Sequence, residues 1–332
     1  MRAIAHDVYG PADLLELRDI DKPPIGDDEV LVEVRAAGVD PGVWILMTGR
    51  PMAVRLAVGL RRPRVAVLGR AVAGVVAAVG ANVTRLRIGD DVYGTCESGS
   101  FAEFAMARQH RLAPKPANLT FEQAAATPIS AVTALQSVRD ARVQPGQRVL
   151  ITGAAGGIGS FAVQLVRAYG GIVTGVCSAA KVELVRSLGA EDVIDYTQHE
   201  IDRGGVRHDV IIDTAGNRPL SLLRRAVTPR GTIALVGGGH AKGWLLGGFQ
   251  RQMAAPLVSL FGSQRVCGVT ARERHEDLDE LTPLIESGTV TPVIDRTYAL
   301  ADAPDAIRYL AQGHPAGKVV VTMQSAASPP TK

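Results

Sequence analysis

The stretch that decides the fold is "VLITGAAGGIGSFAVQ", which runs from Val149 to Gln164. Between an apolar, β-branched run and a stretch with helical character it places four glycines: Gly153, Gly156, Gly157 and Gly159. In a helix or strand a glycine costs about 0.5–1 kcal/mol relative to alanine, because it has more backbone freedom to lose. Four glycines at one place therefore indicate a turn whose backbone has to come close to a ligand or to a neighbouring part of the chain.

The residues around this stretch alternate between strand and helix patterns. Thr120 and Gln123 form a capping box before a helix. After it, apolar strands such as "IVTGVCS" and "DVIIDTAG" alternate with helices such as "IGSFAVQLVRAYG". Strands that are apolar throughout and alternate with helices are typical of a parallel sheet covered on both faces. The sequence thus predicts an α/β domain with a doubly wound parallel sheet.

In that setting the glycines predict a dinucleotide site. A strand, a glycine turn and a helix let the backbone approach a pyrophosphate, which the amide groups at the start of the helix bind. The spacing is A-x-G-G-x-G, with alanine where the usual fingerprint begins with glycine. A glycine-rich turn without a ligand is the alternative. The predicted contacts are Ala154, Gly156, Gly157, Ile158 and Gly159.

The end of the second strand indicates which dinucleotide binds. An NAD site usually has an acidic residue there to hold the ribose hydroxyls. This chain instead reads "GVCSAAK", with a hydroxyl at Ser178 and a cation at Lys181. The next strand ends at Tyr196, whose phenol could reach the same phosphate. These residues predict NADPH (NADP+) as the cofactor, and an ordinary solvated helix lysine is the alternative for Lys181.

The first third of the chain has short strand-like runs separated by turns, which is typical of a small barrel or sandwich. Strand patterns return in "VTPVIDRTYAL" and "GKVVVTM", so we expect the C-terminal part to rejoin this domain. A length of 332 residues favours two domains. The predicted division is 1–121 completed by 290–326, a dinucleotide domain at 122–289, and a frayed tail at 327–332.

Composition narrows the class of protein. The chain is 46% apolar and 21% charged with a formal net charge of +3, which is too mild to indicate nucleic acid or membrane binding. The arginines of "LRRPRVAVLGR" have no interleaved aromatic residues, so we interpret them as a solvated or pocket-rim surface. Three widely spaced cysteines and an N-terminus without an apolar signal core favour a cytoplasmic protein.

Several phrases, taken together, resemble one family over nearly the whole chain. They include "AAGVDPGVW", "LGRAVAGVVAAVGANVTRLRIGDDVYG", "GSFAEFA", "FEQAAATPISAVTAL", "GAAGGIG" and "VRSLGAEDVIDY". The sequence is similar to the zinc-independent medium-chain dehydrogenases/reductases of the quinone oxidoreductase type. The resemblance implies a GroES-like β-barrel domain, a Rossmann domain, an active site between them, and a homodimer.

The residue types at the positions where related proteins bind zinc argue against a bound metal ion. Zinc-dependent relatives carry a cysteine ligand where this chain has Asp40, and a histidine ligand where it has Arg70. A guanidinium cannot ligate zinc. The four-cysteine structural lobe is also missing, because only Thr95 to Gly99 separate the phrases that flank it in those relatives. We therefore expect neither a catalytic nor a structural zinc site.

The resemblance also assigns residues to cofactor and substrate. It places Thr133, Gly216 and the Gly237–Gly238 turn at the cofactor, and Lys318 at its pyrophosphate. Asp40 takes the place of an asparagine that touches substrate in quinone reductases, and a carboxylic acid there could donate a proton. The alternative for Asp40 is an Asp-Pro turn capped by its own side chain.

An apolar substrate pocket is expected from Trp44, Met47 and Trp244, with packing in a core as the alternative for the tryptophans. The glycine-broken, apolar segment 240–262 is expected to cover this pocket or to form an interface helix. Its helical part is too short and interrupted to cross a bilayer.

Three functions are compatible with these residues. The leading one is an NADPH-dependent reductase of quinones or α,β-unsaturated carbonyls. The second is an NADP(H)-dependent alcohol dehydrogenase or carbonyl reductase that acts on aldehydes; Gly42, where zinc relatives often have a proton-relay Ser or Thr, counts against it. The third is a non-enzymatic module that senses NADPH or binds a partner.

Overall fold

The computed structural model describes residues 1–237, 249–259, 262–313 and 315–323. The chain divides into two compact units, and both are made from separate stretches of sequence. Unit 1 comprises Met1–Ile129, Glu273–Glu286 and Pro292–Lys332, and unit 2 comprises Ser130–Arg272 and Ser287–Thr291. The first border thus lies at Ile129 and not at residue 121, and residues 273–286 belong to unit 1 and not to the dinucleotide domain.

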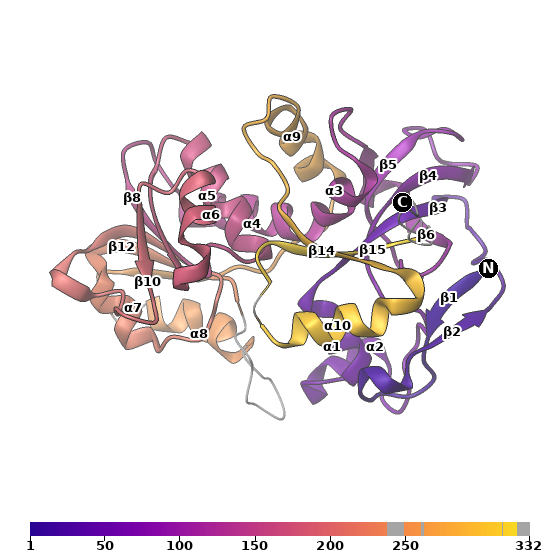
Figure 1. The fold of residues 1–332 in the computed structure, drawn as a ribbon, viewed down its shortest axis with the longest axis horizontal. Helices are drawn as coiled ribbons and strands as arrows, with labels where there is room; N and C mark the ends of the chain where they lie inside the picture. Colours follow the sequence, from indigo (N-terminus) through magenta and orange to yellow (C-terminus); the bar gives the residue numbers. More distant parts are fainter. Residues whose placement is uncertain (238–248, 260–261, 314, 324–332) are drawn as a thin grey trace, which may run out of the picture. The chain divides into compact units, whose positions relative to one another are not determined.

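Unit 2 contains a parallel sheet of six strands in the order β10-β9-β8-β11-β12-β13. The strands are β8 (Arg148–Thr152), β9 (Ile172–Cys177), β10 (Asp192–Asp195), β11 (His208–Asp213), β12 (Val227–Leu235) and β13 (Arg265–Gly268). The helices are α4 (Pro128–Ala141), α5 (Gly157–Ala168), α6 (Val182–Ser187), α7 (Leu220–Ala226) and α8 (Phe249–Ser259). Figure 1 shows α5 and α6 on one side of this sheet and α7 and α8 on the other. The predicted doubly wound sheet is confirmed.

The order of the strands places a topological switch point between β8 and β11. From β8 the chain proceeds outward through β9 to β10, and from β11 it proceeds the other way through β12 to β13. Open α/β sheets bind ligands in the crevice outside the carboxyl ends of the strands at such a point. The glycine turn at Gly153–Gly157 directly follows β8, so it lies at this crevice.

Unit 1 is built around a sheet of seven strands in the order β14-β15-β3-β4-β5-β7, with β6 paired to β3. Its strands are β3 (Glu29–Val39), β4 (Ala71–Val79), β5 (Asp91–Thr95), β6 (Phe104–Arg108), β7 (Leu112–Pro114), β14 (Ile294–Ala299) and β15 (Lys318–Thr322). A separate pair is formed by β1 (Arg2–Ala5) and β2 (Glu16–Asp19). The helices of this unit are α1 (Pro41–Thr48), α2 (Arg55–Val58), α3 (Phe121–Ala126), α9 (His275–Glu286) and α10 (Ala303–Ala311).

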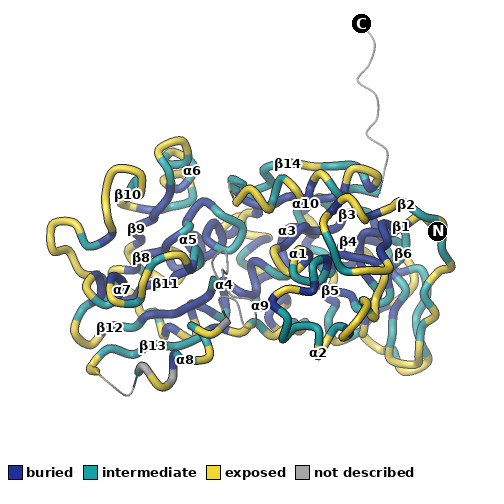
Figure 2. Tube along the Cα trace, turned by 90° about the horizontal axis from the view of Figure 1, so that it is seen from below, coloured by how far each residue is buried: buried dark blue, intermediate teal, exposed yellow. Residues whose placement is uncertain are grey.

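The C-terminal strand returns to the N-terminal domain as expected. β15 pairs with β3 in antiparallel register, with Val319 opposite Val39. The central position of β3 in the sheet agrees with its alternating pattern of burial. Val30, Val32 and Val34 are buried, while the residues between them are partly exposed. This alternation puts one face of the strand into the core. In the parallel sheet the central strands β8 and β11 are almost entirely buried (Figure 2).

A close approach of helix to strand explains the glycine in "AAGV". The predicted capping box is confirmed, because the Thr120 hydroxyl accepts from Gln123 N and the Gln123 side chain accepts from Thr120 N. The helix α3 that it starts lies so near β3 that a Cβ at Gly38 would come within 2.5 Å of the Ala125 carbonyl oxygen. Any larger residue at Gly38 would push α3 away from the strand that leads to Asp40.

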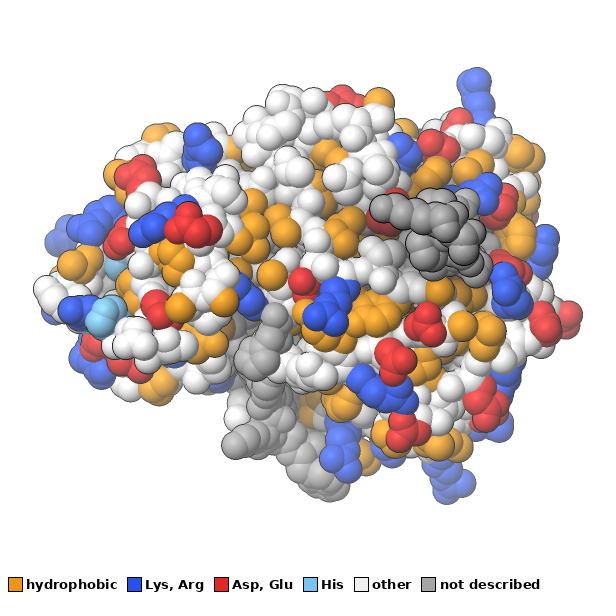
Figure 3. Space-filling view, in the orientation of Figure 1, with side chains coloured by type: hydrophobic (Ala, Val, Ile, Leu, Met, Phe, Trp, Pro, Cys, Tyr) orange, Lys and Arg blue, Asp and Glu red, His pale blue; other side chains and the backbone are white. Residues whose placement is uncertain are grey.

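The surface has charges of both signs. On the face drawn in Figure 3, Lys and Arg side chains are interspersed with Asp and Glu. Among the described residues, no helix combines the length and the apolar character needed to cross a membrane.

Candidate functional site

The glycine turn after β8 is as tight as the sequence predicts. Gly153 has φ of +64°, in the left-handed region that favours glycine. A Cβ at Gly159 would lie 2.1 Å from the Gly153 carbonyl oxygen and 2.8 Å from the Ala154 Cα. Both neighbours are backbone, so glycine at 159 is what allows α5 to start directly against the turn.

The start of α5 offers amide groups to an anion. Gly156 is its N-cap, and the first helical hydrogen bond runs from Ser160 N to Gly156 O at 2.9 Å. The amides of Gly157, Ile158 and Gly159 precede this bond, and such first-turn amides have no partner within a helix. A Cβ at Gly156 would meet only the Gly153 carbonyl oxygen, at 3.3 Å, so a ligand could come close to the backbone there. A pyrophosphate fits these features.

Ala154 and Gly216 support the turn from the sheet. Ala154 is fully buried, and its amide donates to the Val176 carbonyl oxygen of β9 at 3.0 Å. Gly216 has φ of +66°, and its amide donates to Oδ1 of Asp213 at 3.2 Å. Ala154 therefore packs inside the protein with its amide bonded to β9, and its expected contact with the cofactor stays a prediction.

A buried carboxylate organises the switch point. Asp213, at the end of β11, is fully buried and accepts hydrogen bonds from Thr152 Oγ1 at 2.7 Å and Arg251 Nη2 at 3.2 Å. Arg251, on α8, also donates to the Gly216 carbonyl oxygen. Gly237 N donates to the Asp213 carbonyl oxygen at 3.0 Å. The network joins the turns after β8, β11 and β12 at the edge where the cofactor is expected.

Sequence reasoning missed Arg251. The phrase "DTAGN" marks Asp213 at a strand end, but nothing near it in the sequence indicates a cation. The partner follows 38 residues later on α8. An arginine in a helix is usually solvated, so only the packing of α8 reveals this role.

The three residues expected at the 2′-phosphate come from neighbouring strand ends. β9 and β10 pair in parallel register with Cys177 opposite Asp195, and Tyr196 N donates to the Cys177 carbonyl oxygen at 3.1 Å. Ser178 follows β9 directly, and Lys181 N donates to the Ser178 carbonyl oxygen at 2.9 Å in a short 3-10 turn. Burial raises the pKa of the Cys177 thiol, so it stays neutral at this edge. The sheet thus places Ser178, Lys181 and Tyr196 just beyond the carboxyl ends of two neighbouring strands, and contact of their side chains with a 2′-phosphate stays a prediction.

Thr133 is buried on α4, where its carbonyl oxygen accepts from Ser137 Oγ at 2.6 Å. Gly238 and Trp244 lie outside the described residues, as does most of the segment 240–262 apart from α8, and so does the tail 327–332. Their expected roles stay predictions.

In unit 1 the structure joins two residues that the sequence analysis treats separately. Lys318 Nζ donates to Oδ1 of Asp40, and both residues are almost completely buried. Asp40 is the N-cap residue of α1, but its side chain makes no capping hydrogen bond. The Asp-Pro turn capped by its own side chain is therefore not what forms. The ammonium that was expected at the pyrophosphate has Asp40 as its partner here.

The two predicted pocket residues on α1 differ in exposure. Trp44 is 40% exposed, so it does not pack in a core. Met47 has no exposed surface and lies in the core cluster with Val43, Leu68 and Phe101. A contact between substrate and Met47 would require this core to open, whereas Trp44 can meet a ligand without rearrangement.

Arg70, which the resemblance places where zinc-dependent relatives have a histidine ligand, takes part in an ion-pair cluster. Its guanidinium lies 2.5 Å from Glu273, which also pairs with Arg111 at 2.9 Å, and Arg111 lies 2.9 Å from Glu97. Cys96 is buried beside this cluster, and burial raises the pKa of its thiol to about 12. Among the described residues, no group of three or more His, Cys, Asp and Glu side chains is placed to hold a metal ion.

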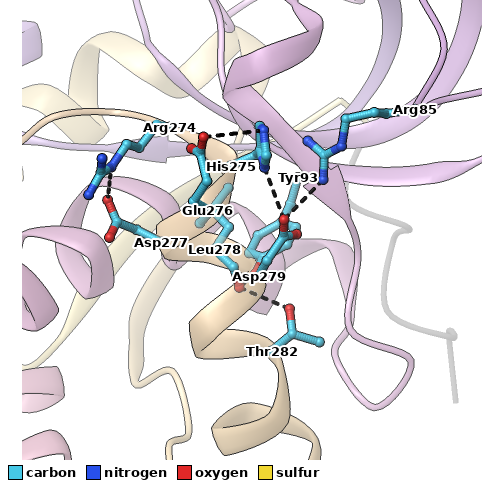
Figure 4. A network of polar contacts seen from close by, with 9 residues as sticks. All are labelled: Arg85, Tyr93, Arg274, His275, Glu276, Asp277, Leu278, Asp279 and Thr282. Carbon is cyan, nitrogen blue, oxygen red and sulfur yellow. Dashed lines mark hydrogen bonds and ion pairs between the residues drawn. The ribbon is translucent and has the colours of Figure 1, made fainter.

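A second polar network lies on α9 (Figure 4). Asp279 accepts from His275 Nδ1 at 2.9 Å and pairs with Arg85 at 3.0 Å, and the Leu278 carbonyl oxygen accepts from the Tyr93 hydroxyl at 3.3 Å. His275 and Arg85 also line an open cavity of about 520 Å³. The cavity is lined by charged and polar residues and by none of the site residues predicted from the sequence. The network fastens α9 to β5.

Comparisons with known proteins agree with the fold. A family described as "Alcohol dehydrogenase GroES-like domain" matches residues 26–117, and one described as "Zinc-binding dehydrogenase" matches residues 188–321. The chain is 32% identical to a 2-methylene-furan-3-one reductase of Solanum lycopersicum, over 97% of this chain and 79% of the relative. It is 33% identical to an NADPH-dependent alkenal/one oxidoreductase of Arabidopsis thaliana, a chloroplastic protein, over the same shares.

A solved structure gives the same result at the level of the fold. The quinone oxidoreductase from Coxiella burnetii superposes with a TM-score of 0.85 at 27% identity, covering 98% of this chain and 99% of the other. An NAD(P)H oxidoreductase of Mus musculus, RTN4IP1, is 31% identical over 97% of this chain and 89% of the relative. The chain belongs to the medium-chain dehydrogenase/reductase family, in its quinone oxidoreductase and alkenal/one reductase type.

Proposed function

We propose that this protein is an NADPH-dependent, zinc-independent reductase of quinones or α,β-unsaturated carbonyl compounds. The observation that carries the choice of cofactor is the edge formed by β9 and β10, where a hydroxyl, an ammonium and a phenol replace the carboxylate of an NAD site. The choice of substrate is supported by the relatives, which include a 2-methylene-furan-3-one reductase and an alkenal/one oxidoreductase. A homodimer and a cytoplasmic location stay predictions.

The chain's own residues bind the cofactor and handle a proton. The amides of Gly157, Ile158 and Gly159 would hold the pyrophosphate, and Ser178 and Lys181 the 2′-phosphate. When bound, the nicotinamide supplies a hydride to the substrate. Asp40 would stand at the substrate and pass on a proton, and Trp44 would offer an apolar surface. The test of the whole proposal is NADPH oxidation against a panel of quinones, enones and aldehydes.

The preference for NADPH gives a direct prediction. A charge-assisted hydrogen bond contributes about 1.5–3 kcal/mol, or one to two decades of affinity. We therefore expect NADPH to bind at least about tenfold more tightly than NADH. Lys181→Ala should remove most of this difference and leave NADH affinity almost unchanged. Nucleotide affinity is measured by fluorescence titration of the wild type and the variant.

A matched control separates the loss of the contact with the 2′-phosphate from the mere loss of one positive charge. Arg186→Ala also removes one cation from the segment after β9, but Arg186 pairs with Glu183 on the exposed side of α6. It should keep the preference for NADPH. Equal affinity of the wild type for NADH and NADPH would overturn the interpretation of "CSAAK".

The protein is also predicted to work without metal. Arg70 is held by Glu273, and a guanidinium cannot replace a histidine as a ligand. Purified protein should contain no stoichiometric zinc by elemental analysis, and chelators should leave the rate of NADPH oxidation unchanged. Zinc that is lost together with activity on chelation would contradict this prediction.

A further inference from the structure

The ion pair between Lys318 and Asp40 is held from both sides by the main chain. Asp40 directly follows β3 as the N-cap residue of α1, and its carbonyl oxygen accepts from Val43 N at 2.9 Å. Lys318 begins β15, and its amide donates to the Val293 carbonyl oxygen at 2.8 Å. Because Val319 lies opposite Val39, the two strands bring the side chains together although 278 residues separate them in sequence.

The lysine side chain has little freedom at this position. Its Nζ lies 3.4 Å from the Val39 carbonyl oxygen as well as against Asp40. The preceding Gly317 has φ of +106°, and a Cβ there would come within 2.4 Å of the Val293 carbonyl oxygen. The backbone therefore directs the ammonium to the end of β3.

The fold alone does not account for this pair. A buried ion pair is a weak stabiliser, because desolvation of both charges offsets their attraction, and apolar residues of similar size often serve as well. The pair does have a chemical consequence, since the Lys318 ammonium carries transferable protons and donates one of its N–H groups directly to the Asp40 carboxylate.

We propose that Lys318 is the proton source behind Asp40. This inference rests on the proposed reduction of α,β-unsaturated carbonyl compounds. The enolate that remains after reduction of the β-carbon needs one proton at its α-carbon. An N–H bond of Lys318 breaks as Asp40 takes the proton, and the Asp40 O–H bond then breaks as the new C–H bond forms. Lys318 is left as a neutral amine and recovers its proton from water, so charge and atoms balance over the cycle.

The variant Lys318→Arg separates the effect of proton transfer from the effect of the positive charge. Lys318→Arg keeps a cation next to Asp40, but a guanidinium does not give up its proton. We expect kcat for enone reduction to fall by about 10²-fold or more, the usual contribution of a general acid. The KM for the enone should change far less than kcat, and NADPH affinity, measured by fluorescence without substrate, should stay within about threefold. Quinone reduction should fall much less, because a hydroquinone oxygen can take a proton from water.

Lys115→Arg is the matched control. Lys115 is another lysine of unit 1 with a largely buried side chain, and its Nζ lies 2.9 Å from the Leu119 carbonyl oxygen and 3.8 Å from Asp91. It should leave the ratio of enone to quinone reduction unchanged. If the two arginine variants behave alike, the role of Lys318 is structural and the proposal is wrong.

A second variant covers the case in which arginine does not fit. Lys318→Ala leaves space for a small primary amine, and methylamine should restore enone turnover, whereas tetramethylammonium has the charge without a transferable proton and should not. Rescue by both cations, or full enone turnover by folded Lys318→Arg, would overturn the relay. Failure of the wild type to reduce any quinone or enone with NADPH would instead overturn the proposed function.

Discussion

Gly159→Ala should abolish NADPH binding and lower the stability of unit 2. The new Cβ would lie 2.1 Å from the Gly153 carbonyl oxygen, so α5 and its first amides have to move away from β8. Overpacking of a closely packed site costs about 1–3 kcal/mol, and here both neighbours are backbone, which favours the upper end. Fluorescence titration with NADPH and urea denaturation measure the two effects.

Gly156→Ala tests whether glycine is needed at this position for the approach of the ligand or for the packing of the protein. Its Cβ would meet only one atom, at 3.3 Å, so the free energy of unfolding should change by no more than about 1 kcal/mol, the range of N-cap substitutions. NADPH affinity should nevertheless fall at least about tenfold, because the methyl group occupies the side from which the pyrophosphate approaches. Gly42→Ala, in α1 of unit 1 with no atom within 4 Å of its Cβ, is the control: it should leave NADPH affinity unchanged and stabilise the protein by no more than about 1 kcal/mol. Unchanged NADPH affinity in Gly156→Ala would show that the turn does not hold the cofactor.

Asp40→Asn should lower the rate of enone reduction by about 10²–10⁴, because an amide cannot pass on a proton. NADPH affinity should hardly change, since the glycine turn and the β9–β10 edge belong to unit 2 and Asp40 belongs to unit 1. Quinone reduction should suffer less than enone reduction. Rates with both substrate classes, measured with saturating NADPH, give the comparison.

Stability has to be measured on the same variant. Loss of the carboxylate leaves the Lys318 ammonium buried without its counter-charge, and removing one partner of a buried pair costs about 3–5 kcal/mol. The asparagine oxygen can still accept a hydrogen bond, so we expect a smaller cost and a folded protein. Asp279→Asn, which removes a partly exposed carboxylate from the α9 network, is the control with a similar chemical change. Full enone turnover by a folded Asp40→Asn variant would show that water, and not Asp40, supplies the proton to the substrate.

The parts of the fold that the sequence predicts are those that depend on neighbouring residues. The doubly wound sheet follows from the alternation of apolar strands and helices, and the capping box of Thr120 and Gln123 forms within one helical turn. The glycine turn is equally local, because Gly153 and Gly159 contact each other across six residues. Hydrophobic periodicity and turn chemistry act over such short ranges, so they can be recognised in one dimension.

The domain border was less predictable, because it depends on contacts between residues that are far apart in the sequence. Helix α3 follows the change of pattern at Thr120, yet it packs on β3 through Gly38 and so belongs to unit 1. Helix α9 looks like one more helix of the dinucleotide domain, but the Tyr93 hydroxyl and Arg85 hold it to unit 1. Which unit a helix joins depends on the surface it covers, and that surface is far away in sequence.

The sequence by itself determined the class of the fold, the glycine turn after β8 and the residue types at the edge of β9 and β10. Binding of a dinucleotide at this turn, and Asp40 and Arg70 in the place of zinc ligands, stay predictions. Only the tertiary structure decided the partners of the charged residues: Lys318 for Asp40, Arg251 for Asp213 and Glu273 for Arg70. The physical reason is that a charge carries no local pattern. A lysine or arginine in the sequence is compatible with a solvated surface, and its role depends on burial next to an opposite charge that strand pairing and helix packing bring close.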